Sequence, residues 1–189
     1  MRKLILFNMI TLDGFFEGEN QSLEWHNVDD EFNKFAVAQL ETADTLVFGR
    51  INYELMSGYW PTSLALDDDP TVAGIMNSIS KVVISTTLEQ VEWENTRLVR
   101  ENVREELGKL KQQPGKHIFI FGSAELASSI LEMNLIDEYR IMINPVVLGH
   151  GKPLFLNVND KLHLKLIDTK VFKSGNVLLY YEPEKQANQ

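Results

Sequence analysis

The chain has 189 residues, of which 44% are hydrophobic, and its 18 basic and 27 acidic residues give a formal net charge of −9. This length and composition suit a single core, and the negative field disfavours binding to nucleic acid or to an anionic membrane surface. The absence of cysteine excludes disulfides, thiolate catalysis and zinc–sulfur sites. The four histidines are scattered without helical pairs, so we predict no metal site.

The first ten residues combine two basic residues with an apolar run, as a signal peptide does. However, Asn8 interrupts the run, an Asp-Gly turn follows at residues 13–14, and we find no small-residue cleavage site. The run is also too short to span a membrane. We therefore expect a buried strand at residues 3–10 and a cytoplasmic protein.

Strands and helices alternate along the rest of the chain. The alternation and a terminal hairpin predict a three-layer α/β/α sandwich with a mixed, mostly parallel sheet and an antiparallel edge. We expect one domain over residues 1–183 and a polar tail at 184–189. Residues 11–18 and 61–71 are expected to be a turn and a polar loop. The further predicted strands are 45–48, 81–85, 96–99, 117–121, 138–143, 162–172 and 177–182, and the predicted helices are 29–43, 50–57, 72–77, 103–112 and 123–134.

Three polar turns come directly after predicted strands. They are Gly49-Arg50, the hydroxyl run Ser85–Thr87, and Gly122-Ser123. Ligands of open α/β sheets bind outside the carboxyl ends of the strands, where helix N-termini present unpaired N–H groups. Gly49 allows a sharp turn, and the planar guanidinium of Arg50 suits a phosphate. Each turn also has an ordinary structural interpretation as a helix start or a capped turn, and none matches a Rossmann or Walker pattern.

At these residues the sequence resembles the dihydrofolate-reductase-like superfamily. The resemblance is greatest to the branch that contains the reductase domain of the bifunctional riboflavin-biosynthesis deaminase-reductase and its stand-alone relatives. It covers nearly the whole chain. The segments that carry it are TLDGFFEG (11–18), LVFGRINYE (46–54), KVVIST (81–86), IFIFGSAEL (118–126) and INPVVLGHGKPLF (143–155).

The resemblance implies that NADPH binds in an extended pose along the three turns. Many relatives have a basic residue in the adenosine-phosphate turn and a Gly-Gly pair in the second pyrophosphate turn. Here the adenosine-phosphate turn has only hydroxyls, and the nearest cations are Lys81, Arg97 and Arg100. The second pyrophosphate turn is Gly122-Ser123. The implied cofactor residues are Thr11 near the nicotinamide, Phe48, Gly49, Arg50, Asn52 and Tyr53 in the first pyrophosphate turn, Ser85, Thr86 and Thr87 at the adenosine phosphate, and Gly122, Ser123, Ala124 and Leu126 in the second pyrophosphate turn.

A reductase of this type also needs a proton donor. Asp13 is the first candidate because it lies just past the first strand, and a purely structural Asp-Gly turn is the alternative interpretation. Asp30 and Glu31, at the start of the first long helix, are further candidates. The candidate substrate-binding residues are Trp25, Asp30, Phe32 and Trp60, with Tyr53 and Tyr59 as other aromatic residues that either line a pocket or belong to the core.

The predicted function is an NADPH-dependent reductase of a small heterocyclic or carbonyl substrate, pterin-like or ribityl-aminopyrimidine-like. The alternative is a non-catalytic nucleotide-binding or interaction protein that retains the fold. A folate reductase proper is a weaker third hypothesis because the helix acid is not evident. We expect a homodimer and take residues 144–155, a strand end and turn, as a candidate subunit contact.

Overall fold

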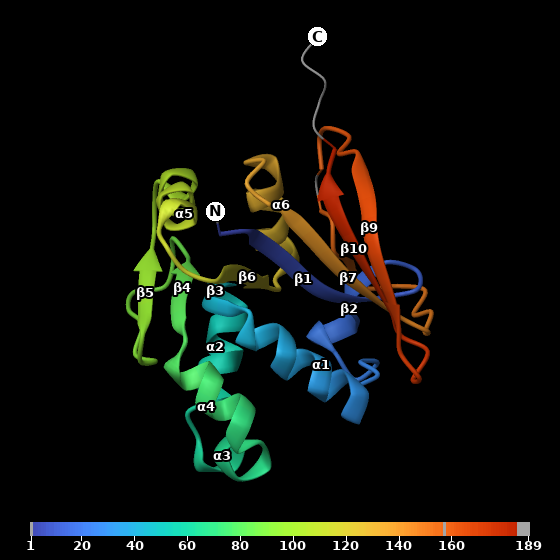
Figure 1. The fold of residues 1–189 in the computed structure, drawn as a ribbon, viewed down its shortest axis with the longest axis horizontal. Coiled ribbons are helices and arrows are strands. Elements are labelled where there is room, and N and C mark those ends of the chain that lie inside the picture. Colours follow the sequence, from blue (N-terminus) through green and yellow to red (C-terminus); the bar gives the residue numbers. More distant parts are fainter. Residues whose placement is uncertain (1, 157, 185–189) are drawn as a thin grey trace.

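The computed structural model describes residues 2–156 and 158–184, with an eight-stranded sheet between two layers of helices (Figure 1). The strand order is β5-β4-β3-β6-β1-β7-β10-β9. All pairs from β5 to β7 are parallel, and β10 is antiparallel to both β7 and β9, which confirms the predicted class and its antiparallel edge. The strands are β1 (Leu4–Thr11), β3 (Ala43–Gly49), β4 (Ser80–Ile84), β5 (Thr96–Val99), β6 (His117–Phe121), β7 (Glu138–Asn144), β9 (Leu164–Val171) and β10 (Val177–Pro183).

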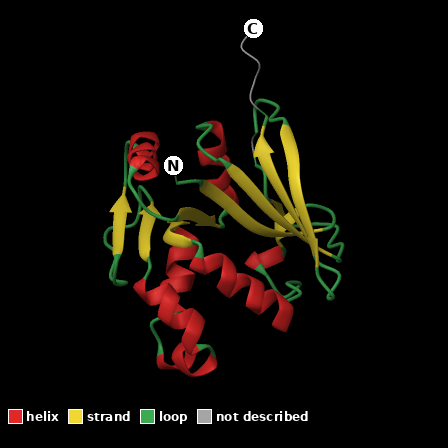
Figure 2. Ribbon diagram, viewed as in Figure 1, coloured by secondary structure: helices red, strands yellow, loops and turns green. Residues whose placement is uncertain are grey.

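The helices lie on both sides of the sheet, so its faces are covered as a parallel sheet requires (Figure 2). One side carries α1 (Asp30–Glu41), α2 (Arg50–Tyr59), α3 (Ser63–Asp68) and α4 (Pro70–Ser78). The other side carries α5 (Val103–Gln112) and α6 (Ala124–Glu132). A short 3-10 helix, η1 (Glu19–Gln21), lies in the segment between β1 and α1.

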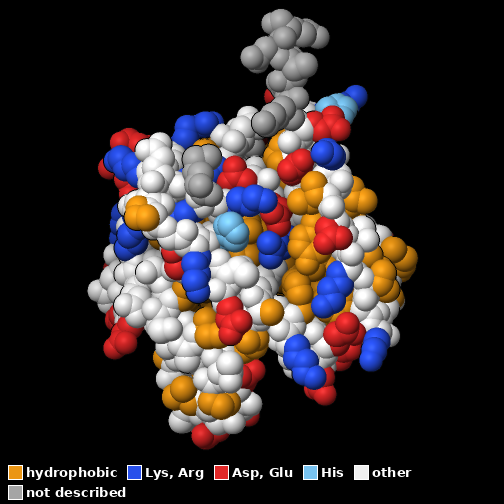
Figure 3. Space-filling model, viewed as in Figure 1, with side chains coloured by type: hydrophobic (Ala, Val, Ile, Leu, Met, Phe, Trp, Pro, Cys, Tyr) orange, Lys and Arg blue, Asp and Glu red, His pale blue; other side chains and the backbone are white. Residues whose placement is uncertain are grey.

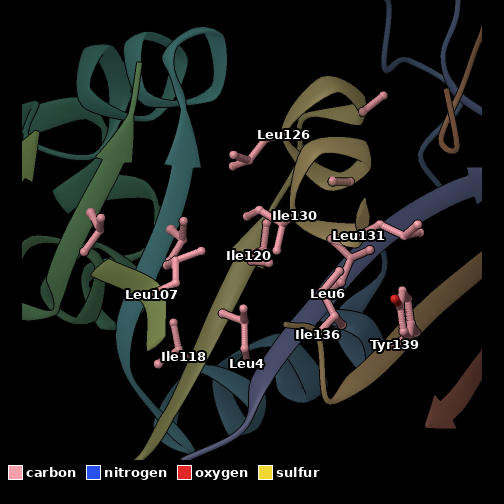
Figure 4. Packing of buried hydrophobic residues seen from close by; sticks show 14 of the residues in the cluster. Leu4, Leu6, Leu107, Ile118, Ile120, Leu126, Ile130, Leu131, Ile136 and Tyr139 are labelled. Atoms are coloured by element: carbon pink, nitrogen blue, oxygen red, sulfur yellow. The ribbon is translucent and has the colours of Figure 1, made fainter. Parts of the chain in front are cut away.

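The core is divided by the sheet because successive strand side chains point to opposite faces. Leu4 and Leu6 of β1 belong to the cluster that packs on α5 and α6, whereas Ile5 and Phe7 belong to the cluster beneath α1, α2 and α4. Figure 4 shows the first cluster, in which side chains of α6 lie over those of β6 and β1. Burial on both faces explains why β1 is an almost continuous apolar run.

The prediction of a loop at residues 61–71 is wrong, because this segment contains α3 and the start of α4. The Thr62 hydroxyl accepts a hydrogen bond from the Ala65 amide at 3.3 Å and caps α3. The Asp69 carboxylate accepts one from the Val72 amide at 2.9 Å, and Pro70 occupies the first turn of α4. Polar residues that suggested a loop therefore serve as two successive helix caps.

A small two-stranded sheet pairs β2 (Phe15–Glu17) with β8 (Lys152–Pro153), and neither strand was predicted. Gly151 allows this pairing, because at its φ of +154° a Cβ atom would lie 2.5 Å from the carbonyl oxygen of Glu17. The pairing holds the segment after β1 close to the carboxyl end of the main sheet.

Three asparagines hold the segment between η1 and α1 against the same end of the sheet. The side chain of Asn144, which is fully buried, accepts a hydrogen bond from the Asn27 amide at 2.9 Å and donates one to the Ile10 carbonyl at 3.3 Å. Asn176 Nδ2 donates to the Asn27 carbonyl at 2.7 Å. Both backbone groups of Asn27 are thus bound by side chains distant in sequence.

Among the described residues, no helix is long and apolar enough to cross a membrane. The predicted polar tail at 184–189 lies outside the described residues except for Glu184. The extent of this tail and the cytoplasmic location of the protein stay predictions.

We expect Asn144→Ala to lower the free energy of unfolding by about 1–3 kcal/mol, because the partly buried Asn27 amide loses its acceptor and the fully buried side chain of Asn144 is removed. Amide hydrogen exchange should accelerate at residues 22–29 more than in the strands. Asn33→Ala, at an exposed position on α1, is the control and should change neither measurement appreciably. Unchanged exchange at residues 22–29 in Asn144→Ala would contradict the role given to Asn144.

Candidate functional site

The three predicted turns meet at the carboxyl edge of the sheet. Gly49 and Arg50 come from β3 and α2, Ser85 and Thr86 follow β4, and Ser123 follows β6. Together they border a cavity of about 470 Å³, which we call the turn cavity. Its other lining residues are Ile51, Ile84, Val103, Glu125, Leu126, Ser129, Ile130 and Met133.

Two helix N-termini open into the turn cavity. At the start of α2 the N-cap is Gly49, which has no side chain to accept hydrogen bonds from the first amides. At the start of α6 the hydroxyl of Ser123 accepts one from the Leu126 amide at 3.4 Å. Unpaired amides and the positive ends of two helix dipoles make this a favourable place for an anion such as a diphosphate.

Arg50 adds a positive charge beside these amides. Its guanidinium forms an ion pair with Glu54 one turn further along α2, at 3.0 Å, and both side chains are nearly half exposed. An exposed pair of this kind contributes little to stability, so the guanidinium can turn to an anion in the turn cavity at small cost.

Several predicted cofactor residues have structural roles instead. Phe48 and Ala124 are fully buried in the core. The hydroxyl of Tyr53 accepts hydrogen bonds from the amides of Glu92 at 3.0 Å and Trp93 at 3.3 Å. The amide of Thr87 donates to the Ser85 hydroxyl at 3.2 Å, which shapes the turn after β4.

A second cavity, of about 400 Å³, lies beside the turn cavity. Ile51 lines both, and the Gly122-Ser123 pair separates them, since Gly122 lines the second cavity and Ser123 the first. Most of its walls are hydrophobic, so we call it the apolar cavity. It is lined by Phe7, Asn8, Met9, Phe16, Glu17, Gln21, Leu23, His26, Ile51, Asn52, Leu55, Met56, Phe121 and Gly122.

Gly122 is required where the two cavities adjoin. It has a φ of +52°, and a Cβ atom there would lie 2.0 Å from Nδ2 of Asn52. The Gly122 amide donates to Oδ1 of Asn8 at 3.0 Å, and Asn52 Nδ2 donates to the Phe121 carbonyl at 2.9 Å. The Gly122–Ser123 peptide is cis. These contacts place the end of β6 between two asparagine side chains.

Two buried polar atoms of the apolar cavity's lining have no protein partner among the described residues. They are Nδ2 of Asn8, a residue that is only 3% exposed, and Nε2 of His26. Because Oδ1 of Asn8 accepts from Gly122, its Nδ2 is left as a donor. Burial lowers the pKa of His26 to about 4, so the ring is neutral at pH 7. Unpaired polar atoms in a mostly apolar cavity are typical of a ligand site.

Asp13, the predicted proton donor, lines neither cavity as described. Its exposed carboxylate accepts hydrogen bonds from the Thr11 hydroxyl at 2.6 Å and from the Gly149 amide at 2.7 Å. These bonds, led by the one from Thr11, lower the pKa of Asp13 from 3.8. A carboxyl group held ionised is a poor acid, so the geometry supports the alternative interpretation, a structural turn. Thr11 itself is part of this turn, because its hydroxyl also accepts from the Phe15 amide.

The four predicted substrate residues are not part of the described lining of the apolar cavity, although two of them contact residues that are. Trp60 donates its indole N–H to the sulfur of Met56 at 3.1 Å, and Phe32 packs in the core beneath α1. Asp30 is exposed in the first turn of α1. Trp25 contributes only through His26, on which its ring packs edge-on with centroids 4.4 Å apart. Large aromatic side chains bury wherever apolar surface is available, and here the helix–sheet contacts supply it.

Sequence reasoning missed three lining residues that can act on a ligand, namely Asn8, Glu17 and His26. For Asn8 a signal exists, because a polar residue in the middle of an apolar strand must bond to something. Glu17 and His26 lie in segments whose position depends on the unpredicted β2–β8 sheet and on the asparagine contacts to residue 27.

Of the three cations near the adenosine-phosphate turn in sequence, Arg100 alone is near it in space. Lys81 is buried at the start of β4, where its ammonium donates to carbonyls of residues 76 and 79. Arg97 pairs with Glu106 at 3.0 Å and borders a cavity at the opposite edge of the sheet. Arg100 follows β5 at the carboxyl edge and donates to the Glu89 carbonyl at 2.5 Å.

Comparisons with known proteins agree with this architecture. The family model of the RibD C-terminal domain matches residues 2–179. The uncharacterized protein YyaP of Bacillus subtilis is 36% identical over 182 residues, covering 95% of this chain and 94% of that protein. The crystal structure of a putative riboflavin biosynthesis protein from Shewanella sp. PV-4 has a TM-score of 0.74 and 25% identity over 97% of this chain and 99% of that chain.

Two more distant structures share the fold. One is a diaminohydroxyphosphoribosylaminopyrimidine deaminase/5-amino-6-(5-phosphoribosylamino)uracil reductase from Thermotoga maritima, with a TM-score of 0.68 and 13% identity over 96% of this chain and 56% of that chain. The other is dihydrofolate reductase from Enterococcus faecalis complexed with NADP(H), with a TM-score of 0.63 and 15% identity over 97% of each chain. The predicted dihydrofolate-reductase-like fold is thereby confirmed.

The lowered pKa of His26, whose Nε2 atom is buried, predicts that the stability of the folded protein decreases in acid. Between pH 6.5 and about 4 the unfolded chain binds a proton at this residue that the folded protein does not, so stability falls as the pH is lowered through that window. We expect the loss to be on the order of 2 kcal/mol.

Chemical denaturation from pH 7 to pH 4 measures this loss. His26→Gln should show a shallower decline than the unmodified protein, and His163→Gln, at an exposed histidine, should not. Parallel declines for the unmodified protein and His26→Gln would show that His26 is not the group responsible.

Proposed function

Because the chain belongs to the RibD C-terminal domain family, we propose that it is an NADPH-dependent reductase of a small heterocyclic or carbonyl compound. The observation that carries the proposal is the placement of two adjoining cavities at the carboxyl edge of the sheet. One has the amides and the cation that suit a dinucleotide, and the other has the mostly apolar walls that suit a flat organic substrate. The fold itself is a reductase fold.

The chain's own residues provide a fit for the cofactor. The amides at the starts of α2 and α6 would hold the diphosphate, with Arg50 beside them, and the Ser85 and Thr86 side chains would contact the adenosine end. When bound, NADPH supplies the hydride for the reduction. Gly122 borders the apolar cavity without a side chain, so a planar group can approach the backbone closely there.

The apolar cavity would orient the substrate and limit the access of water. Its walls include Phe7, Phe16 and Phe121. Such walls restrict the orientations that a bound ring can adopt. Glu17 lines this cavity, where its carboxylate would accept a hydrogen bond from the substrate and so help to orient it. The Glu17 side chain is only 16% exposed, and its carboxylate lies 3.4 Å from the ammonium of Lys152.

The alternative is a nucleotide-binding protein without catalysis. It is favoured by the finding that Asp13 is unsuited to donate a proton. It predicts one result that the main proposal does not, namely that the protein binds the cofactor but oxidises no NADPH with any substrate tried.

The predicted homodimer also remains a proposal. It is supported by exposed apolar side chains on β9, where Leu166 is 49% and Val171 is 70% exposed (Figure 3).

Saturating NADPH should stabilise the folded protein, by about 2.7 kcal/mol at a concentration of one hundred times the dissociation constant. We expect Arg50→Ala to weaken NADPH binding about tenfold through loss of a charge-assisted contact to phosphate. Thermal melting with and without NADPH measures both effects.

Glu54→Gln is the matched control, because it breaks the same ion pair and leaves Arg50 in place. It should bind NADPH at least as tightly as the unmodified protein. No melting shift with either NADPH or NADH would overturn the proposed cofactor.

We expect Arg100 to determine the preference for NADPH over NADH. Arg100→Ala should weaken NADPH binding about tenfold and change NADH binding little, because NADH lacks the additional phosphate. Arg97→Ala removes the same charge from the opposite edge of the sheet and should leave the ratio of the two dissociation constants unchanged. Equal losses for both nucleotides in Arg100→Ala would contradict this assignment.

A further inference from the structure

The charge of the apolar cavity restricts what it can bind. Among its described lining residues, Glu17 is the one acidic residue, and His26 is neutral at pH 7. No lysine or arginine belongs to the described lining. A substrate with a phosphate group would therefore meet a carboxylate and no balancing cation inside the cavity.

The cation that pairs with Glu17, Lys152, is already neutralised. The ammonium of Lys152 contacts Glu17 at 3.4 Å and also forms an ion pair with Glu125, which lines the turn cavity. One ammonium between two carboxylates leaves this cluster with a net charge of −1. A phosphate could bind Lys152 only by displacing a carboxylate that holds it, so the cluster opposes a dianion.

The unpaired polar atoms define one edge of the ligand. Nδ2 of Asn8 can only donate a hydrogen bond, so the atom facing it must be an acceptor such as a ring carbonyl oxygen. The carboxylate of Glu17 can only accept when ionised, so it favours a ring N–H or an amino group. The neutral ring of His26 accepts or donates according to its tautomer.

We propose, resting on the reductase function above, that the apolar cavity takes an unphosphorylated flat heterocycle that carries a ring carbonyl next to an N–H or amino group. This chemistry sets the chain apart from the Thermotoga maritima reductase, whose name specifies a phosphoribosyl compound. The substrate is neutral or cationic, its carbonyl faces Asn8, and its N–H or amino group faces Glu17.

A matched pair of probes tests this proposal. They are 5-amino-6-(5-phosphoribosylamino)uracil and the same compound without its phosphate, each titrated into protein saturated with NADPH. We expect the dephosphorylated compound to bind about tenfold more tightly, because it avoids repulsion from the carboxylate cluster. Glu17→Gln should narrow this ratio by strengthening binding of the phosphorylated compound.

Asn8→Asp tests the donor separately. Aspartate keeps the oxygen that accepts from the Gly122 amide but replaces Nδ2 with a second acceptor, so binding of the dephosphorylated compound should fall about tenfold. Gln21→Glu is the control, because it adds the same charge to the lining while Asn8 keeps its donor. Its effect on the dephosphorylated compound should be clearly smaller.

The outcomes separate this proposal from the function on which it rests. Absence of a melting shift with both NADPH and NADH overturns the reductase function. A normal NADPH shift together with equal or tighter binding of the phosphorylated compound overturns the substrate assignment alone. Binding of neither compound at millimolar concentration, in protein that shows the NADPH shift, also contradicts the assignment.

Discussion

The hydrogen bond from the Gly122 amide to the Asn8 side chain is the constraint on which both cavities depend. It joins the middle of β1 to the residue after β6, and both partners are buried. Gly122 is fixed between Asn8 and Asn52, and its lack of a Cβ atom makes this approach possible. Because one residue of the Gly122-Ser123 pair lines each cavity, a shift at this point would change both. The buried side-chain amide of Asn8 is bonded through Oδ1, which leaves its Nδ2 donor for a ligand.

The two cavities differ in electrostatics although they adjoin. The turn cavity receives the positive ends of two helices and the charge of Arg50. Glu125 also lines it, but this carboxylate is paired with Lys152. The positive charges act at short range, so they can hold an anion although the chain has a net charge of −9. The apolar cavity has Glu17, with Lys152 held between Glu17 and Glu125. Such a division suits a site in which one partner is a polyanion and the other is not. It also disfavours entry of the polyanion into the wrong cavity.

The placement of the three turns at one edge was predictable from the sequence, because all parallel strands end at the same edge of a sheet. Gly49, Ser85 and Ser123 border one cavity because β4, β3 and β6 are also neighbours in the sheet. The apolar cavity was not predictable in this way. It depends on strands of three and two residues, β2 and β8, and on contacts such as that between Asn27 and Asn144, which are 117 residues apart. Short strands and distant side-chain contacts leave no periodic pattern. The aromatic residues failed as predictors for a related reason, since residue type does not distinguish a cavity wall from the core.

The segment TLDGFFEG shows how a residue outside the cavities still shapes them. Asp13 binds the amides of residues 148 and 149, and this loop leads directly into β8. The pairing of β8 with β2 brings Lys152 opposite Glu17, so the position of the Glu17 carboxylate depends on the turn that Asp13 stabilises. The two acids of this segment therefore have different functions, and an acid at position 13 is needed as an ionised acceptor. Its lowered pKa, a disadvantage for a proton donor, is what this structural function requires.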